Sequence, residues 1–314
     1  MNKIIKILII ILFNLSIISK VNSEELNQKK LDNLNKIKYL KKSLEEFRVN
    51  IKKIEKDPLS VKFIYAFKYS YYISKPPKPE KTIYLLKDVD NKSKHPLINE
   101  INMLLADSYL DLGIKEIKLK NHQKAKDLLL KAKKIISFIS PKYTPPRKEG
   151  EPEDISFSYE SIKKWQIASP ENVKVFKKNI DDLIINMFGT IAEGKIYNDK
   201  GKKDYKGGIN ELEALNKLYP NTEIYYNHIG YALFFNKQVE LGLKLMKKGV
   251  ELFPKSGQMY YQFACISSLN KDKENAIYNL RKSIELDKKF LNYAKQEEDL
   301  KFIREDKIFN SLVK

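Results

Sequence analysis

Apolar positions in two consecutive segments, 223–256 and 257–290, recur at intervals of three and four residues. This spacing places the apolar side chains on one face of an α-helix. Each segment holds two such stripes separated by a short polar stretch, which predicts a pair of antiparallel helices. Tyr226 and Tyr260 occupy equivalent places in the two segments. The pattern therefore predicts two successive helical hairpins with the same internal order.

Small residues also recur at equivalent places, where paired helices would approach most closely. The equivalent pairs are Gly230 and Ala264, Gly242 and Ala276, and Gly249 and Ser283. Met246 and Leu280 would fill the space between hairpins. Because one hairpin cannot bury its own apolar face, stacked neighbours must supply the core. The predicted fold class is all-α, an α-solenoid of stacked antiparallel helical hairpins.

The unit length and its order of large, small and aromatic places resemble the tetratricopeptide repeat. Tyrosine stands at 226 and 260 where the family usually has tryptophan, and glycine or serine replaces some of its alanines. The resemblance implies a superhelix whose concave side is lined by the first helix of each hairpin. It also implies that this groove binds a protein or peptide, and it says nearly nothing about which one.

Other stretches extend the array on the N-terminal side. Residues 106–139 follow the same register, and a degenerate hairpin before them completes a block from 58 to 139. A weaker copy, 170–222, fits if its turn at Gly201 is longer, and it begins a second block, 170–290. Ser169 and Pro170 predict the helix start there as N-cap and first-turn proline.

Three segments flank these blocks. Residues 24–57 carry an apolar stripe from Ile37 to Ile54 that predicts an amphipathic helix packed on the first hairpin, with a dimer seam as the alternative. Residues 140–169 are rich in proline and charge, which predicts an insertion, either a functional loop or a packed cover. Residues 291–314 predict a C-terminal capping helix.

The first 23 residues have the pattern of a secretory signal peptide. Lys3 and Lys6 precede an unbroken apolar run, Ile7–Phe13, and the small residue Ser23 closes a cleavable stretch. The apolar run is too short to cross a bilayer as a helix. We therefore predict cleavage after Ser23 and an exported chain, periplasmic or secreted, without a transmembrane helix once mature. An uncleaved anchor is the alternative.

The formal charge of +19 changes this picture little. A surplus of this kind favours anionic partners. However, all but four of the basic residues are lysines, whereas proteins that read phosphate tend to use the planar fork of arginine. We interpret the lysines as solvated helix faces and predict no specific nucleic-acid partner.

Catalytic and metal-binding patterns are missing from the sequence. His95, His122 and His228 are scattered, and the lone Cys265 offers no thiolate cluster. The acidic pair at 297 and 298 fits a solvated helix face. We predict no enzyme activity, no catalytic residue, no metal and no cofactor.

The remaining candidate is the inner wall of the predicted groove. By register, side chains pointing away from the helix partner form an aromatic and amide surface suited to an extended peptide or a helix. These partner-binding residues are Lys195, Asn198, Asn227, Tyr231, Phe234, Tyr261, Cys265 and Ser268. The predicted function is a scaffold that binds a protein or peptide of the cell envelope.

Two alternatives of other classes stay open. In the first, the solenoid closes around a small molecule and serves a transporter, which would require a sealed pocket lined by Tyr231 and Tyr261. In the second, the lysine-rich surface binds an anionic envelope polymer or lipid surface, which would make binding strongly dependent on salt. The sequence does not fix the oligomeric state.

Overall fold

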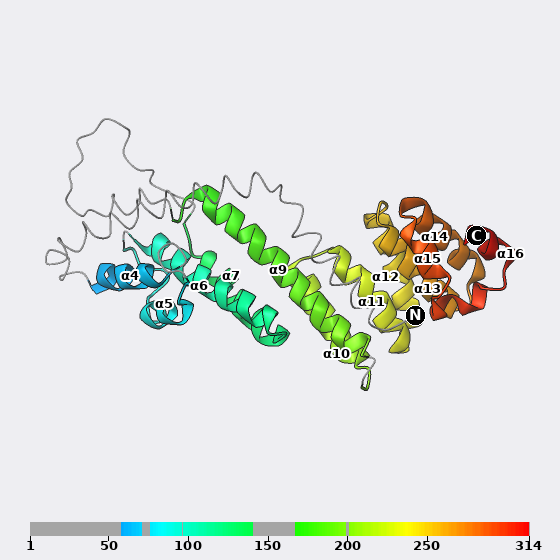
Figure 1. Cartoon of the computed structure of the whole chain (residues 1–314), viewed down its shortest axis with the longest axis horizontal. Coiled ribbons are helices and arrows are strands. Elements are labelled where there is room, and N and C mark those ends of the chain that lie inside the picture. The colour runs from blue at the N-terminus through cyan, green and yellow to red at the C-terminus, as the bar shows by residue number, and fades with distance from the viewer. Residues whose placement is uncertain (1–57, 71–75, 96, 141–166, 199–200, 314) are drawn as a thin grey trace, which may run out of the picture. The chain divides into compact units, whose positions relative to one another are not determined.

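A computed structural model describes five stretches of the chain: 58–70, 76–95, 97–140, 167–198 and 201–313. Every regular element in these stretches is helical, and consecutive helices pack in neighbouring pairs (Figure 1). This confirms the predicted all-α class of stacked helical hairpins. The predicted signal peptide, the helix at 24–57 and nearly all of the 140–169 insertion lie outside the described residues.

The chain divides into two compact units, residues 1–182 and 183–314. The helices of the first unit are α4 (Pro58–Tyr69), α5 (Pro79–Leu86), α6 (Ile98–Lys118) and α7 (His122–Ile136). The first three of these helices each pack against the next one in the chain. Helix α6 begins before the predicted repeat start at Ala106 because Ile101, Leu104 and Leu105 continue its apolar face and are buried.

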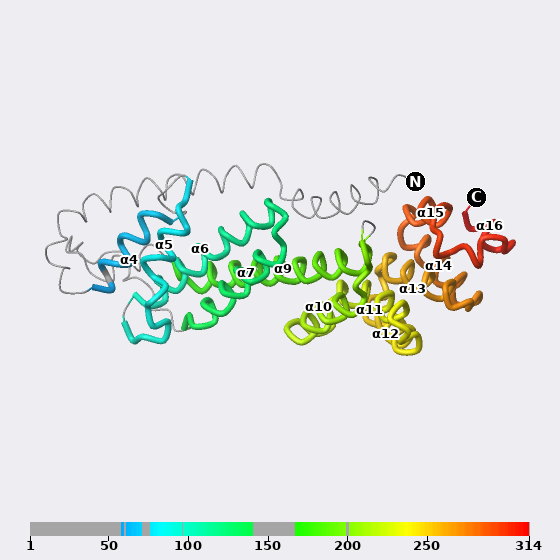
Figure 2. The backbone as a smooth tube through the Cα atoms, turned by 90° about the horizontal axis from the view of Figure 1, so that it is seen from below, coloured from blue at the N-terminus to red at the C-terminus, as the bar shows by residue number. Residues whose placement is uncertain are grey.

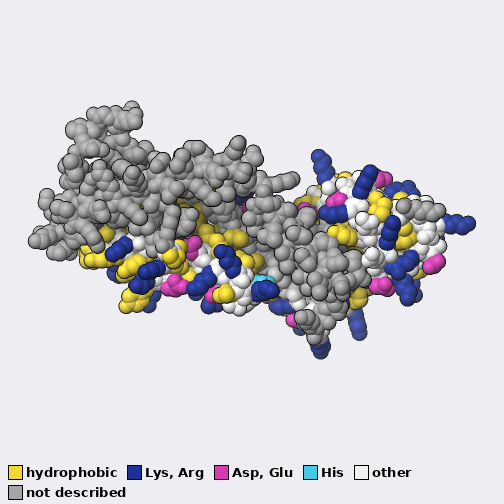
Figure 3. Space-filling model, in the orientation of Figure 1, with side chains coloured by type: hydrophobic (Ala, Val, Ile, Leu, Met, Phe, Trp, Pro, Cys, Tyr) yellow, Lys and Arg dark blue, Asp and Glu magenta, His cyan; other side chains and the backbone are white. Residues whose placement is uncertain are grey.

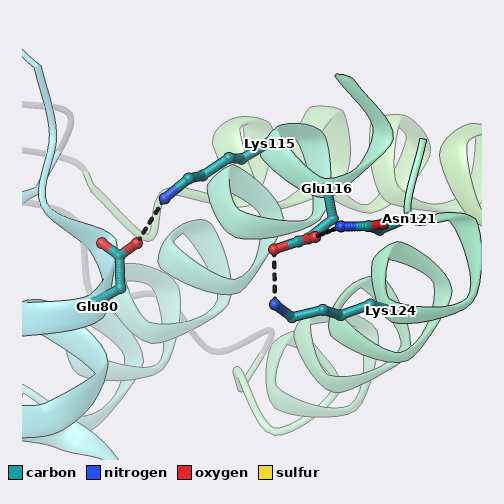
Figure 4. A network of polar contacts seen from close by, with 5 residues as sticks. All are labelled: Glu80, Lys115, Glu116, Asn121 and Lys124. Carbon is teal, nitrogen blue, oxygen red and sulfur yellow. Dashed lines mark hydrogen bonds and ion pairs between the residues drawn. The ribbon is translucent and has the colours of Figure 1, made fainter. Parts of the chain in front are cut away.

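A polar network closes the turn between α6 and α7 (Figure 4). Glu116 accepts a 2.7 Å hydrogen bond from Asn121 and forms a 2.8 Å ion pair with Lys124. These two bonds hold the pKa of the Glu116 carboxyl below its usual value, the bond from Lys124 having the larger effect. The neighbouring pair of Lys115 and Glu80 is exposed on both sides and links α6 to α5. Within this network Glu116 is buried, whereas Asn121 and Lys124 are exposed.

The second unit contains the two most regular hairpins. Helix α9 (Pro170–Ile196) crosses the boundary between the units, and α10 (Tyr205–Leu218), α11 (Glu223–Phe235), α12 (Val239–Leu252), α13 (Gly257–Leu269) and α14 (Lys273–Leu286) follow it. From α10 to α14, each helix packs against the next one in the chain (Figure 2). Asp204, Ser256 and Asp272 cap α10, α13 and α14 with side-chain hydrogen bonds. Ser169 likewise caps α9, as predicted.

Glycine allows the close approach of α11 and α12. A Cβ atom on Gly242 would lie 2.9 Å from the carbonyl oxygen of Gly230. A Cβ on Gly230 would lie 2.4 Å from the Met246 side chain, which is fully buried. The small residues predicted at the helix contact therefore lie where there is no space for a side chain.

The turn of each of the three hairpins α6–α7, α11–α12 and α13–α14 contains a lysine with positive φ. Lys120, Lys237 and Lys271 have φ angles of 62°, 64° and 60°. Side chains with a Cβ are strained in this left-handed region, where glycine is not. The three residues occupy the same place in their repeats, so each hairpin carries the same local cost.

We expect Lys237→Gly and Lys271→Gly each to raise the free energy of unfolding, by about 0.5–1 kcal/mol, because glycine relieves the left-handed strain. Urea denaturation followed by circular dichroism measures the change. Lys247→Gly is the matched control, because Lys247 is exposed within α12. There the same substitution should cost about 0.7 kcal/mol of helix propensity. Equal effects at the turn and in the helix would contradict the prediction.

Three short helical segments, rather than the single predicted helix, close the second unit. They are α15 (Lys289–Ala294), the 3₁₀ helix η1 (Glu298–Ile303) and α16 (Lys307–Leu312). Leu300, Ile303 and Phe309 are at most 2% exposed and pack against the inner residues of α13 and α14. They cover the apolar face that a further hairpin would otherwise cover. Among the described helices, none is both long and apolar enough to cross a membrane.

Candidate functional site

Three tyrosines of the second unit, Tyr197, Tyr231 and Tyr261, lie on or directly after the first helices of successive hairpins. The rings of Tyr197 and Tyr231 lie 4.9 Å apart between centroids, and Tyr231 lies 4.6 Å from Phe235. Tyr261, on the next hairpin, stacks on Phe290 at 5.0 Å. We call Tyr197, Tyr231 and Tyr261 the tyrosine face. Tyr197 directly follows the last residue of α9, whereas Tyr231 and Tyr261 lie on α11 and α13; these are the helices expected to line the groove.

A histidine joins this face to a carboxylate. His228 Nε2 lies 2.9 Å from Glu193 Oε1, and its Nδ1 lies 3.5 Å from the Tyr197 hydroxyl. A proton on Nε2 would be donated to Glu193 and would leave Nδ1 to accept from Tyr197. Glu193 lies in the last turn of α9 and Tyr197 directly follows that helix, so His228 connects α11 to the C-terminal end of α9.

Two further carboxylates approach the face from the C-terminal segment. The Tyr261 hydroxyl donates to Glu297 at 3.4 Å. Asp299 interacts electrostatically with all three members of the tyrosine face. Arg304 holds this segment in place by donating to the backbone carbonyl of Glu297 at 2.7 Å. Glu193 of α9 therefore acts on Tyr197, Glu297 acts on Tyr231 and Tyr261, and Asp299 acts on all three.

Burial and negative charge act together on these phenols. Desolvation raises the pKa of Tyr197, Tyr231 and Tyr261 above its usual value. The charge of Asp299 adds to the rise at all three tyrosines. All three tyrosines therefore stay neutral hydroxyls at physiological pH. Their rings and hydroxyls are available for packing and hydrogen bonding rather than for acid–base chemistry.

The structure places the predicted binding residues at two depths. Tyr231, Tyr261, Cys265 and Ser268 are buried, at 8%, 5%, 1% and 1% exposed. Lys195, Asn198, Asn227 and Phe234 are half-buried. Cys265 interacts electrostatically with all of the tyrosine face and so lies close to it. Lys195 forms a 3.0 Å ion pair with Glu211 of α10. That this surface binds a partner stays a prediction.

Two of these residues hold buried oxygens that have no hydrogen-bond partner within the described part of the chain. They are the side-chain oxygen Oδ1 of Asn227 and the hydroxyl oxygen of Ser268. Asn227 lies one turn before Tyr231 on α11, and Ser268 lies one turn after Cys265 on α13. Leaving such a buried group unpaired costs about 1–3 kcal/mol. A hydrogen-bond donor supplied from outside the described residues would recover that energy.

Sequence reasoning did not assign the groups around the tyrosines to this site. Tyr197 lies between the predicted residues Lys195 and Asn198, so its place in the helix could have indicated it. In the sequence His228 is one of three scattered histidines with no site assigned, and the acidic pair at 297 and 298 fits a solvated face. No periodic signal reveals the position of Glu297 and Asp299, because they lie at a 3₁₀ helix and not on an α-helical stripe.

Two surface hollows lie elsewhere. One, of about 490 Å³, is bounded by α12, α13 and α14, with Tyr260, Phe263 and Tyr278 in its lining. The other, of about 110 Å³, lies between α7 and α9 beside the ion pair of Lys133 and Asp181. Both are lined by residues other than Tyr231 and Tyr261. Within the described residues, no group of three or more histidine, cysteine or acidic side chains could hold a metal ion.

Comparison with known proteins adds one structural likeness. No family model matches the chain. No curated protein matches it significantly. A similar solved structure is the TPR2AB domain of yeast Sti1 in complex with pHSP90, at 17% identity and a TM-score of 0.31. The match covers 93% of this chain and 100% of that one. The fold assignment as a tetratricopeptide-like array follows from the paired helices and their glycine contacts described above.

Proposed function

We propose that the chain is an exported interaction module that binds a polypeptide segment of a cell-envelope protein against the tyrosine face. The observation that supports this proposal is the composition of the tyrosine face. It combines aromatic rings, which give contact area, with the unpaired Asn227 and Ser268 oxygens, which can accept from a peptide backbone. The leader-like first 23 residues support the location, and the hairpin array supports binding without bond chemistry.

Site-directed photocrosslinking tests this proposal. Phe234 is half-buried on α11 and contacts the ring of Phe235, 5.3 Å away between centroids. A photoreactive phenylalanine at position 234 should capture a discrete envelope protein in the native cell, identified by mass spectrometry. The matched control is the same group at Tyr278, an aromatic position that is 55% exposed on α14. Equal capture from both positions, or none from position 234, would remove the groove as the binding site.

The double variant Tyr231→Ala with Phe234→Ala gives a second readout. It should abolish the adduct formed from a photoreactive group at Asn227 while circular dichroism still reports the helices. Tyr231 is buried, so Phe234→Ala alone provides a milder variant that removes the more exposed ring. An adduct that survives both variants would contradict the proposal.

A further inference from the structure

The larger surface hollow of the second unit combines aromatic rings with polar groups. It has a volume of about 490 Å³ and is bounded by α12, α13 and α14. Sites for small molecules usually have about 300–1,000 Å³ and combine apolar walls with a few placed polar groups. Tyr260 and Phe263 of α13 and Tyr278 of α14 supply the rings. None of these three residues belongs to the tyrosine face, so the hollow is a separate surface.

A buried amide oxygen is available in the lining of this hollow. Asn279 of α14 is only 2% exposed and lines the hollow. Its side-chain nitrogen donates to the backbone carbonyl of Asn275 at 2.8 Å, which sets the orientation of the amide. Within the described part of the chain, no group donates a hydrogen bond to the side-chain oxygen of Asn279. A ligand that reaches this oxygen must therefore carry a hydrogen-bond donor.

The lining is electrically balanced, although the chain is strongly basic. The chain has a formal charge of +19, and lysine and arginine side chains stand out over much of its visible described surface (Figure 3). In the hollow, Lys247 and Glu251 of α12 carry opposite charges one turn apart. The nearby Lys282, which interacts electrostatically with Tyr278, is paired with Glu285 at 2.9 Å. A neutral ligand fits this balance better than a polyanion or a polycation does.

We infer that this hollow binds a neutral oligosaccharide through an N-acetylated sugar unit. The inference is independent of the proposed function, which concerns the tyrosine face. A sugar ring has an apolar face of C–H groups that packs on an aromatic ring, and its hydroxyl groups both donate and accept hydrogen bonds. An acetamido group adds an N–H donor directly beside a methyl group.

Each part of such a sugar unit finds a matching group in the hollow. Tyr278 is 55% exposed and offers an open ring for stacking. The acetamido N–H can donate to the oxygen of Asn279, and its methyl group can pack against the apolar part of the lining, which includes Phe263. Lys247 and Glu251 can donate to and accept from the hydroxyl groups. A proline-rich segment would also stack on the rings, but proline has no N–H to donate to Asn279.

Isothermal titration calorimetry with the full-length chain and two tetrasaccharides tests this inference. Chitotetraose is a chain of N-acetylglucosamine, and cellotetraose is a chain of glucose with the same linkage and no acetamido groups. Chitotetraose should bind, and cellotetraose should bind about tenfold more weakly, because one hydrogen bond to a buried acceptor is lost. The affinity should not depend on salt, because neither probe is charged. In saturation-transfer NMR, the acetyl methyl protons should show the strongest contact with the protein.

Matched variants locate the binding site. Tyr278→Ala should weaken chitotetraose binding about tenfold through loss of the stacked ring. Tyr65→Ala on α4, where the tyrosine is 51% exposed, is the control and should leave binding unchanged. Asn279→Leu should remove the preference for chitotetraose, so that both probes bind equally. If Asn279→Leu fails to fold by circular dichroism, the NMR measurement on the parent chain tests the acetamido contact instead.

Each of four outcomes would overturn the inference. Absence of binding for both probes, or equal binding of the two by the parent chain, would exclude a site selective for the acetamido group. An effect of Tyr278→Ala no larger than that of Tyr65→Ala would place binding outside the hollow. Capture of a discrete protein by the photoreactive group at position 278 would show that the hollow binds a polypeptide. The calorimetric outcomes leave the expectation for position 234 unchanged, so failure here is distinguishable from failure of the proposed function.

Discussion

Gly242→Ala is expected to lower the free energy of unfolding of the second unit by about 2 kcal/mol, although alanine is the better helix former. The new Cβ would lie 2.9 Å from the carbonyl oxygen of Gly230 and 3.4 Å from Leu233 Cβ. The nearest atom belongs to the backbone of the facing helix, so no rotamer change relieves the clash. The two helices would have to move apart and lose packing around the fully buried Met246.

Gly194→Ala is the matched control, with the opposite sign. Gly194 is exposed near the end of α9, and a Cβ there would meet nothing within 4 Å. Alanine should therefore stabilise the unit by about 0.5–1 kcal/mol through helix propensity alone. Urea denaturation of both variants gives the comparison. If Gly242→Ala were neutral or stabilising, the hairpin contact described here would be wrong.

Asp107→Asn is expected to stabilise the first unit at pH 8 by roughly 3 kcal/mol and to have little effect at pH 4. Burial raises the pKa of Asp107 to about 7, and the charge of Asp111, one turn along α6, adds to the rise. Burial also raises the pKa of Asp111 to about 6. Asparagine keeps the shape of the protonated acid and cannot ionise.

The sign follows from proton binding. In the unfolded chain the carboxyl of Asp107 ionises near its ordinary pKa of about 3.9. Between that value and about 7 the folded chain keeps a proton that the unfolded chain has released. Folding stability therefore falls as pH rises through this window, and the loss is complete above it. Asparagine removes the dependence on pH at this position.

Calorimetry at pH 4 and pH 8 measures the difference between the parent chain and the variant. Asp88→Asn makes the same chemical change at an exposed residue just after α5 and should alter stability by less than about 0.5 kcal/mol at either pH. An equal gain from Asp107→Asn at both pH values would mean that packing, and not ionisation, sets its effect.

Repeat structure was predictable because the residues that create it are local and periodic. Gly230, Gly242 and Met246 recur as Ala264, Ala276 and Leu280, so hydrophobic spacing and residue size together indicate hairpins. The start of α6 at Ile98 was not predictable from the repeat. The residues before Ala106 are buried and α6 packs against α5, so tertiary contacts prolong the helix beyond its repeat unit.

The site was predictable only in part, for the same reason. The register identified Tyr231 and Tyr261, because positions on one helical face follow from sequence. It could not show that both would be buried, since the burial depends on contacts such as those of Tyr197 and Phe290. Glu297 and Asp299 reach the tyrosines through a 3₁₀ helix after the last repeat. Their contact with the tyrosines joins residues that are far apart in the sequence, and no local pattern predicts it.

The short C-terminal segments α15, η1 and α16 also limit how many repeats can precede them if Glu297 and Asp299 are to stay beside the tyrosines. Duplication of one unit, 257–290, would add a hairpin of the same internal pattern to the array. The added copy would nevertheless carry Glu297 and Asp299 one hairpin farther from Tyr197 and Tyr231. A longer array would remain foldable, but the segment that carries Glu297 and Asp299 would no longer lie beside Tyr197 and Tyr231.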